Sequence, residues 1–482
     1  MNSKELRQNF IDYFSNKRGH SFVRSSTVVP MDDPTLLFTN AGMNQFKDIF
    51  LGKVPAPKNK RAVNSQKCIR VSGKHNDLEE VGVDNYHHTF FEMLGNWSFG
   101  DYYKEDAILW AWDYLTNELN LDKDRLWVTV YKDDDESEIL WKKLTDIDHT
   151  RVLKFGDKDN FWEMGETGPC GPCTEIHYFI GDNVKEQSAD GVNSDELYRE
   201  IWNLVFIQYN RQKNGDLIDL PVKHVDTGMG LERILSTVNG LKDHYETDLF
   251  KPIIEEIERL TSIKCVGDEG VPHRVIADHL RMLSFSIADG AMPSNEGRGY
   301  VIRRVLRRAS RYGKLLSLNE PFIFKLVNVL CDIMGDAYPE LIDKRIHIEE
   351  VIKSEEFSFL KTIDKGITIF EEIISSLSEG DVISGQDAFK LYDTYGFPLD
   401  LTELLASEKG MSVDNSSFSN EMNKQKERAR KSGKFIQDEN ETEWIVISNE
   451  ESSEFVGYQE YTSNSKILKY RNIMRNVRRY SV

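Results

Sequence analysis

Three short segments are candidates for chemistry, and two of them carry residue types that suit the binding of phosphate groups. The first, residues 19–30, predicts a helix that runs into an extended strand, which Pro30 ends because proline has no N–H to continue a ladder. The second, residues 67–95, places arginine, lysine and histidine around a long polar loop. The third, residues 225–234, places two glycines before a helix that carries an arginine. Alone, the first is typical of an ordinary helix–strand junction, so the other two hold the candidate chemistry.

The second segment predicts a strand, a loop and another strand. Arg70 stands at the end of the first strand, where its guanidinium can hold a phosphate through two parallel hydrogen bonds. Lys74 and His75 lie on the loop, where cationic groups can close over phosphates. Phe90 and Phe91 point to opposite faces, so one can pack in the core while the other offers a flat surface to a base. A surface hairpin with one buried phenylalanine is the alternative.

The third segment predicts a turn followed by a helix over residues 226–239. Gly228 and Gly230 let the backbone approach a ligand, and Arg233 projects from the first turns of the helix, whose positive end favours anions. The spacing fits neither a Walker loop nor a dinucleotide fingerprint. The glycine pair followed by Leu-Glu-Arg is therefore the specific part of the pattern.

The elements that must position these segments change character along the chain. Residues 4–16 predict an amphipathic helix, and β-branched and aromatic residues predict strands near 60–70, 87–99, 126–131, 174–180 and 201–209. Helical periodicity then dominates residues 252–260, 272–289, 299–316, 320–334, 343–378 and 385–394. Because regular β-α-β alternation is not evident, we predict an α+β fold with a mainly antiparallel sheet, followed by a helical domain.

The length and composition of the chain limit the number of domains and the class of protein. We predict domains at 1–250 and 251–450, and the truncated start of a further domain at 451–482, in a chain of 482 residues with 39% hydrophobic content. No apolar run is long enough to cross a bilayer, and the N-terminus lacks the apolar core of a signal peptide. We therefore expect a soluble cytoplasmic protein, whose five cysteines are free thiols.

The charge distribution separates one helix from the rest of the chain. A formal net charge of −19 argues against a general nucleic-acid binder, since phosphate contacts need lysine and arginine. Residues 298–314, however, contain no acidic residue, and as a helix they place apolar residues on one face. On the other face we expect a basic stripe of Arg303, Arg304, Arg307, Arg308 and Arg311. This favours a phosphate track; the alternative is a solvated face paired to the protein's own carboxylates.

In this order, the three segments resemble the signature motifs of class II aminoacyl-tRNA synthetases. Longer strings resemble the alanyl-tRNA synthetase branch of that family, namely Asn40–Asp48, His87–Asp101, Phe161–Cys173 and Asp226–Arg233. The resemblance covers nearly the whole chain. It implies a class II antiparallel sheet flanked by helices, followed by a helical tRNA-recognition domain. It also implies an alanine–tRNA ligase, which forms alanyl-adenylate from alanine and ATP and transfers alanine to the 3′ end of tRNA.

The resemblance implies a role for each candidate residue. Arg70 and Arg233 are expected to be catalytic, holding the α- and γ-phosphates of a bent ATP. The other implied ATP-binding residues are Lys74, His75, Phe91 and Gly230. The implied alanine-binding residues are Met43, Trp162 as a wall, Asn203 toward the carboxylate, Val205 as a size limit, Asp226 toward the ammonium, and Gly228. An ammonium in a site with little water needs such a carboxylate partner.

The expected partners are alanine, ATP with Mg²⁺, and the acceptor stem of tRNA(Ala), beside which the resemblance places the arginine-rich helix. Asn295 and Asp393 are the implied readers of a G·U pair, whose free guanine amino group can meet an acceptor in the open minor groove of A-form RNA. The histidine and cysteine pairs of an editing module are absent from this sequence, so we expect no clearance of mischarged tRNA. We also expect a monomer.

Three alternative interpretations compete with this one. Cys170 and Cys173 have the spacing of half a zinc site, but with only His177 nearby four ligands are not visible. We therefore expect no metal there and a Gly-Pro turn in the wall of the site. A non-catalytic tRNA-binding paralogue is a second function class, against which the joint presence of the phosphate and alanine residues speaks. An editing deacylase is a third, and its motifs are missing.

Overall fold

A computed structural model describes residues 1–30, 36–72, 75, 76, 78, 80–395, 397–432, 445–448, 464, 466–470, 472–475 and 478–481. The chain divides into two compact units, one of Met1–Phe370 with Tyr395–Leu401 and the other of Glu371–Thr394 with Thr402–Val482. These borders differ from the domain borders at 250 and 450, which stay a prediction. No helix in the described part of the chain is long and apolar enough to cross a membrane.

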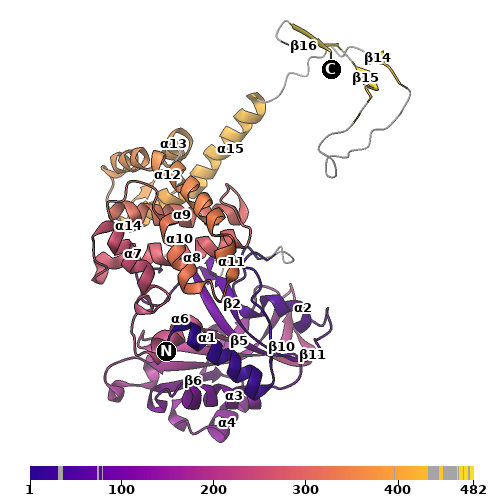
Figure 1. Cartoon of the computed structure of the whole chain (residues 1–482), viewed down its shortest axis with the longest axis vertical. Helices are drawn as coiled ribbons and strands as arrows, with labels where there is room; N and C mark the ends of the chain where they lie inside the picture. Colours follow the sequence, from indigo (N-terminus) through magenta and orange to yellow (C-terminus); the bar gives the residue numbers. More distant parts are fainter. Residues whose placement is uncertain are drawn as a thin grey trace. The chain divides into compact units, whose positions relative to one another are not determined.

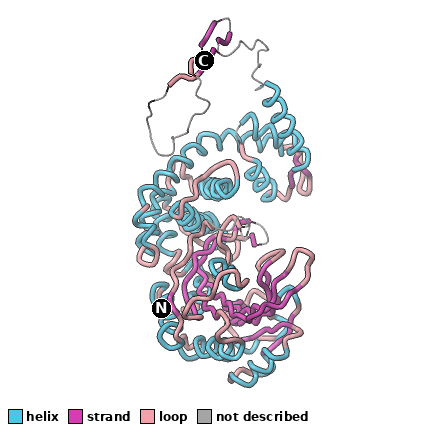
Figure 2. Tube along the Cα trace, turned by 90° about the vertical axis from the view of Figure 1, so that its right-hand side faces the viewer, coloured by secondary structure: helices cyan, strands magenta, loops and turns pink. Residues whose placement is uncertain are grey.

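The first unit is built on a sheet with the strand order β1-β2-β5-β11-β10-β9-β6-β7, and β8 pairs with β9 (Figure 1, Figure 2). The strands are β1 Ser21–Phe22, β2 Arg61–Ile69, β5 Phe90–Ser98, β6 Leu126–Tyr131, β7 Val152–Phe155, β8 Phe161–Glu163, β9 Gly168–Phe179, β10 Tyr198–Arg211 and β11 Leu217–Gly230. Within the described strands of this sheet, only β1–β2 and β6–β7 are parallel pairs. The prediction of an α+β fold with a mainly antiparallel sheet is confirmed.

The central strands carry most of the predicted alanine-binding residues. Val205 of β10 lies opposite Asp226 of β11, and Asn203 lies opposite Gly228. The predicted turn at residues 226–230 is wrong, because this stretch is the end of β11 and pairs with β10 and β5 on its two sides. The following helix, α6 Leu231–Val238, begins only where that pairing ends.

An aromatic cluster holds the N-terminal helices to the sheet. The helix α1 Ser3–Asp12 begins at a capping box, in which the side chains of Asn2 and Glu5 each accept a hydrogen bond from the other's backbone N–H. The ring centroid of its Phe10 lies 5.4 Å from that of Tyr114, which follows α3 Lys104–Asp113, and 5.9 Å from that of Trp202 in β10. These rings are fully buried, so the cluster forms part of the core beneath the sheet.

The later part of the first unit is helical, as predicted. Its helices are α7 Lys251–Thr261, α8 Val271–Ala288, α9 Gly297–Leu315, α10 Ile323–Met334, α11 Pro339–Asp343 and most of α12 Arg345–Ile374 (Figure 1). The helix α8 is buried along nearly its whole length. Its Phe285 stacks on Phe90 of β5 with ring centroids 4.3 Å apart, so the helices and the sheet share one core.

The second unit contains a short parallel strand pair, β12 Val382–Ile383 with β13 Ser412–Val413. Most of α13 Gly385–Tyr395 and α14 Leu399–Glu408 and all of α15 Asn415–Ser432 also belong to it. Beyond them, β14 Ile445–Val446 pairs with β15 Lys469–Tyr470, and β16 Asn472–Arg475 pairs with β17 Arg478–Ser481. Much of the predicted third region at 451–482 lies outside the described residues.

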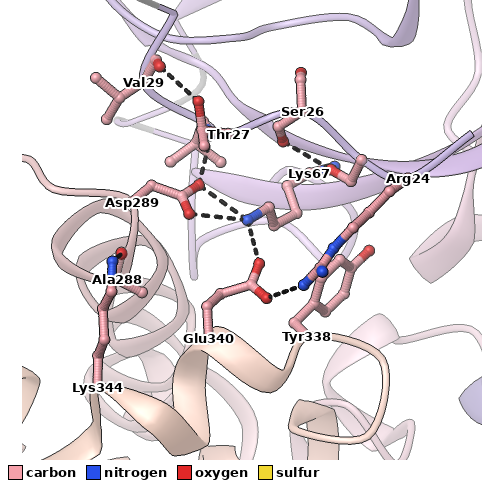
Figure 3. A network of polar contacts seen from close by, with 12 residues as sticks. Arg24, Ser26, Thr27, Val29, Lys67, Ala288, Asp289, Tyr338, Glu340 and Lys344 are labelled. Carbon is pink, nitrogen blue, oxygen red and sulfur yellow. Dashed lines mark hydrogen bonds and ion pairs between the residues drawn. The ribbon is translucent and has the colours of Figure 1, made fainter.

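A buried ion network ties β2 to the helices of the first unit (Figure 3). Lys67 of β2 is 2% exposed, and its Nζ lies 2.9 Å from Asp289 Oδ2, directly after α8, and 2.6 Å from Glu340 Oε1 in α11. Arg24 donates a further hydrogen bond of 2.9 Å to Glu340. Because Lys67 stands three residues before Arg70, the network fixes the strand that carries the predicted phosphate ligand.

Candidate active site

A cavity of about 240 Å³ lies over the central strands and the start of α6. Most of the predicted ATP- and alanine-binding residues line it: Arg70, Phe91, Trp162, Asn203, Val205, Asp226, Gly228, Gly230 and Arg233. They come from segments that are far apart in the sequence. The structure therefore brings the two sets of residues together around one space.

Three of the predicted ATP- and alanine-binding residues are not among the described residues that line this cavity. Met43 is fully buried in an apolar cluster with Trp97 and Val205, where it backs the cavity wall. Lys74 lies outside the described residues. The structure describes only the backbone of His75, in a short strand that pairs with residues 71–72, so the predicted loop contains a small hairpin.

Arg70 lines the cavity and lies directly after β2. Its backbone N–H donates to the carbonyl of Thr89 at 3.0 Å, and its Nε donates to the carbonyl of Asn40 at 3.3 Å. The guanidinium carbon lies 5.0 Å from the ring centroid of Phe91. Phe91 is half-buried and lines the cavity while Phe90 is fully buried, so the prediction that these rings face opposite sides is confirmed.

Arg233 projects into the cavity from the first turn of α6, a position that favours anions because of the helix dipole. Its Nη1 donates to the carbonyl of Glu200 at 3.0 Å and lies 3.2 Å from that residue's Oε2. The start of α6 is held by the buried Glu232, which accepts a hydrogen bond of 3.1 Å from the backbone N–H of Glu92 and pairs with Arg281. Arg233 is thus a fixed cation with donors left for a ligand.

Asp226 provides a buried carboxylate in the middle of the cavity. Its Oδ1 accepts a hydrogen bond of 2.6 Å from Trp97 Nε1. Burial raises the pKa of Asp226 to about 7, and the bond from Trp97 offsets only part of that effect. No cation pairs with it in the described part of the chain. A bound ammonium is the chemical group that this environment suits best.

Asn203 and Glu175 form the neighbouring polar wall. Asn203 Nδ2 donates to Glu175 Oε1 at 3.1 Å. Burial and the negative charge of Glu200 raise the pKa of Glu175 to about 7, while a contact of 3.3 Å with His177 works in the opposite direction. Two carboxylates, those of Glu175 and Glu200, therefore face one cavity with incomplete charge compensation.

The sequence patterns missed several residues of the cavity, among them Tyr86, His88, Glu175, Glu200 and Ile201. The register of β10 against β9 shifts between Glu200 and Trp202, which marks a bulge. A bulge breaks strand alternation, so Glu200, Ile201 and Asn203 can all contribute to one face. Strict alternation in the sequence could not predict this.

The expected exposed basic stripe on α9 is wrong for two of its members. Arg308 and Arg311 are only 4% and 9% exposed. Arg308 Nη1 lies 2.9 Å from Nε2 of the buried His279, because α8 packs against this side of α9. Arg303 Nε lies 2.8 Å from Glu355, and Arg307 Nη2 lies 3.7 Å from the same carboxylate. Part of the basic stripe therefore pairs with a carboxylate of the protein itself, as the alternative interpretation expected.

The two predicted base readers are both exposed. Asn295 Oδ1 accepts a hydrogen bond from Arg303, in the segment that precedes α9. Asp393 lies on α13, and its Oδ1 accepts a hydrogen bond from Gln425 of α15. They belong to different compact units.

The cysteine pair lies in a strand and not in the predicted turn. Cys170 and Cys173 belong to β9, which pairs with β8 and β10. Both are buried free thiols, and burial raises the pKa of each. Their Sγ atoms lie 3.8 Å from the backbone carbonyl oxygens of Tyr209 and Asp159. They are thus part of the packing of the wall.

The chain belongs to the class II aminoacyl-tRNA synthetases, since the family model described as "tRNA synthetases class II (A)" matches residues 5–480. A relative from Chlorobium phaeobacteroides named alanine–tRNA ligase is 55% identical over 468 residues, which cover 95% of this chain and 52% of the relative. Relatives of the same name from Chlorobaculum tepidum and Cytophaga hutchinsonii are 52% and 49% identical, each over 98% of this chain. The chain spans about half the length of these curated relatives, 52–55% of each.

Proposed function

We propose that this chain activates alanine with ATP and transfers it to tRNA, acting as a monomer in the cytoplasm. The observation that carries the proposal is the single cavity in which Arg70 and Arg233 accompany the buried carboxylate of Asp226. Two cations suit a polyphosphate, and a buried anion suits an ammonium. The names of the similar proteins support alanine as the amino acid.

The proposed reaction needs positioning more than covalent catalysis. The carboxylate of alanine attacks the α-phosphorus of ATP in line, and pyrophosphate leaves from the opposite side. Arg70 holds the α-phosphate and Arg233 the γ-phosphate, so that both neutralise charge as it develops. The terminal ribose hydroxyl of tRNA then attacks the alanyl-adenylate and releases AMP.

Mg²⁺ is the expected companion of ATP in this reaction. The described residues contain no cluster of three or more metal ligands. Mg²⁺ commonly uses one or two protein carboxylates together with substrate phosphates, and Glu175 and Glu200 face the cavity with mutual repulsion. These two residues fit the ion, which when bound neutralises negative charge on the triphosphate.

The amino-acid end of the cavity fits a small side chain. Val205 and Trp162 line it, and a Cβ added at Gly228 would come within 2.9 Å of Met93 Sδ, which leaves little room there. Asp226 receives the ammonium and Asn203 lies toward the carboxylate. With a wall of this kind, alanine and glycine differ in their free energy of binding by only about 1–3 kcal/mol, and serine is only weakly excluded by its hydroxyl group.

Alanine binding should depend on pH through Asp226. Its carboxylate must be ionised to hold an ammonium, and in the free protein burial raises its pKa to about 7. A bound ammonium lowers that pKa. The affinity for alanine is therefore at its maximum above pH of about 7 and falls about tenfold for each pH unit below it. The KM for alanine should therefore rise between pH of about 7 and about 5.5. A KM for alanine that is constant over this range would contradict the role of Asp226.

The test of the proposed activation step is exchange of labelled pyrophosphate into ATP. We expect exchange that requires alanine and occurs without tRNA, because the cavity alone holds all reacting groups. A non-catalytic protein that only binds tRNA would give no alanine-dependent exchange. Absence of such exchange by this chain would therefore refute the proposal.

We further propose that Arg303, Arg304 and Arg307 contact the phosphates of the acceptor stem, and that Asn295 and Asp393 read a G·U pair. The half-burial of these arginines and the exposure of both readers support this. A phosphate contact neutralises charge, so its loss reduces the salt dependence of binding by about one unit. A carboxylate that meets a guanine amino group neutralises no phosphate.

Asp393→Ala should reduce charging of a G·U stem minihelix while leaving pyrophosphate exchange unchanged. The physical reason is that this carboxylate is the proposed acceptor for the amino group that only the wobble pair leaves free. Charging of G·U and G·C minihelices is compared for the wild type, Asp393→Ala and the neighbouring exposed control Thr394→Ala. If Asp393→Ala keeps the full preference for G·U, Asp393 is not the reader.

A further inference from the structure

A second cavity of about 330 Å³ borders the candidate active site and shares part of its lining. Tyr86, His87, Glu200 and Arg233 line both cavities. The second cavity is also lined by Arg199, which the assigned site residues do not include. Arg233 thus borders both spaces.

Arg199 is a buried cation whose hydrogen bonds are incomplete. It is 8% exposed, and it occupies the second position of β10. Its Nη2 donates to the carbonyl of Lys242 at 2.7 Å. Its Nε and Nη1 are buried and have no hydrogen-bond partner among the described residues. Buried donors without an acceptor are costly, so a ligand that supplies acceptors would be favoured.

A second guanidinium lies on the same aromatic ring. The guanidinium carbons of Arg199 and Arg233 lie 5.3 and 5.8 Å from the ring centroid of Tyr86. Burial lowers the pKa of Arg199, and the positive charge of Arg233 lowers it further. Arg233 has Glu200 as its carboxylate partner, whereas Arg199 forms no ion pair among the described residues, so a bound anion would stabilise Arg199.

Glu200 compensates the charge of Arg233, but the other carboxylates near the pair leave Arg199 without an ion pair in the described part of the chain. The negative charges of Asp243 and Asp84 oppose the lowering of the pKa of Arg199, but neither residue forms a hydrogen bond with it. Asp84 is already engaged with His87. Asp195 and Glu196 line the cavity and are exposed to solvent, so their effect on a buried guanidinium is screened.

We infer that Arg199 and Arg233 together form a binding site for the terminal phosphates of a nucleoside triphosphate, and that the same pair holds inorganic pyrophosphate. The identity of the nucleotide rests on the proposed function, but the phosphate chemistry rests on the two guanidinium groups. A guanidinium presents parallel N–H donors that match phosphate oxygens. The two free donor atoms of Arg199 supply these contacts.

Direct titration of the intact chain with inorganic pyrophosphate, ATP and AMP tests this inference. For Arg199→Gln we expect ~10- to 100-fold weaker binding of pyrophosphate and ATP, because charge-assisted hydrogen bonds are lost. Binding of AMP should be unchanged, since AMP lacks the terminal phosphates. Arg199→Lys, which keeps the charge but not the fork of donors, should recover part of the affinity.

A matched control separates ligand binding from folding. Arg274 is equally buried at 8% exposure, but it donates to the carbonyls of Gly82 and Gly267. Arg274→Gln should therefore lower the thermal midpoint without reducing pyrophosphate affinity per folded molecule. Arg199→Gln should keep or raise the midpoint of the ligand-free protein, because it removes a buried charge without a partner.

Three outcomes would overturn the inference: no pyrophosphate binding by the wild type, affinity of Arg199→Gln within about twofold of wild type, or equal losses for AMP and ATP. Failure of the proposed function is recognised separately. It would appear as the absence of alanine-dependent exchange in a protein that still binds pyrophosphate through Arg199.

Discussion

Replacement of Arg70 or Arg233 by alanine is expected to lower alanine-dependent pyrophosphate exchange by about 100- to 1,000-fold. Each arginine lines the cavity and is held by a hydrogen bond to a backbone carbonyl, and loss of one such preorganised donor commonly costs that much in the transition state. The defect should appear in kcat and in the KM for ATP. The KM for alanine should change little, because the proposed partner of its ammonium is Asp226 and not either arginine.

The control is another structured arginine outside the cavity. Arg125 donates to the carbonyls of Phe179 and Gly181 and is not part of the cavity lining, so Arg125→Ala should keep exchange within about threefold of wild type. Exchange at the wild-type rate by both Arg70→Ala and Arg233→Ala would show that neither holds the phosphates.

Lys67→Met is expected to destabilise the protein by about 3–5 kcal/mol, since it leaves the buried carboxylate of Asp289 without a cation among the described residues, while Glu340 keeps only Arg24. The substitution leaves two carboxylates facing an apolar group: Asp289, 5% exposed, and Glu340, 18% exposed (Figure 3). The free energy of unfolding from denaturant titration measures the effect.

An exposed ion pair in the same protein provides the comparison. Lys4 Nζ lies 2.6 Å from Asp336, and the two side chains are 73% and 74% exposed. Solvent screens such pairs, so Lys4→Met should cost at most about 1 kcal/mol. If Lys67→Met costs no more than Lys4→Met, the network does not anchor β2.

Local sequence patterns predicted the strands and helices because each depends on neighbouring residues. The alternation at Phe90 and Phe91 placed one ring in the core and one in the cavity, and the structure agrees. The register that sets Val205 opposite Asp226 depends instead on pairing between distant strands. The family resemblance implied that the two residues share one pocket, which periodicity could not indicate, and the register itself comes from the structure.

The differences between prediction and structure arise from tertiary contacts. Arg308 belongs to a helix face that is polar in sequence, yet α8 covers it and His279 contacts its guanidinium. The glycine pair ending at Gly230 is typical of a turn, but strands on both sides keep it extended. The bulge near Glu200 brings that carboxylate to the cavity, and no local pattern marks it.

The central claim is that this cavity selects and activates alanine, and the most direct measurement is pyrophosphate exchange with each amino acid in turn. We predict the highest kcat/KM for alanine, weak but measurable exchange with glycine and serine, and none with larger side chains, which the wall at Val205 and Trp162 excludes. Preference for another amino acid, or exchange with none of them, would contradict the account.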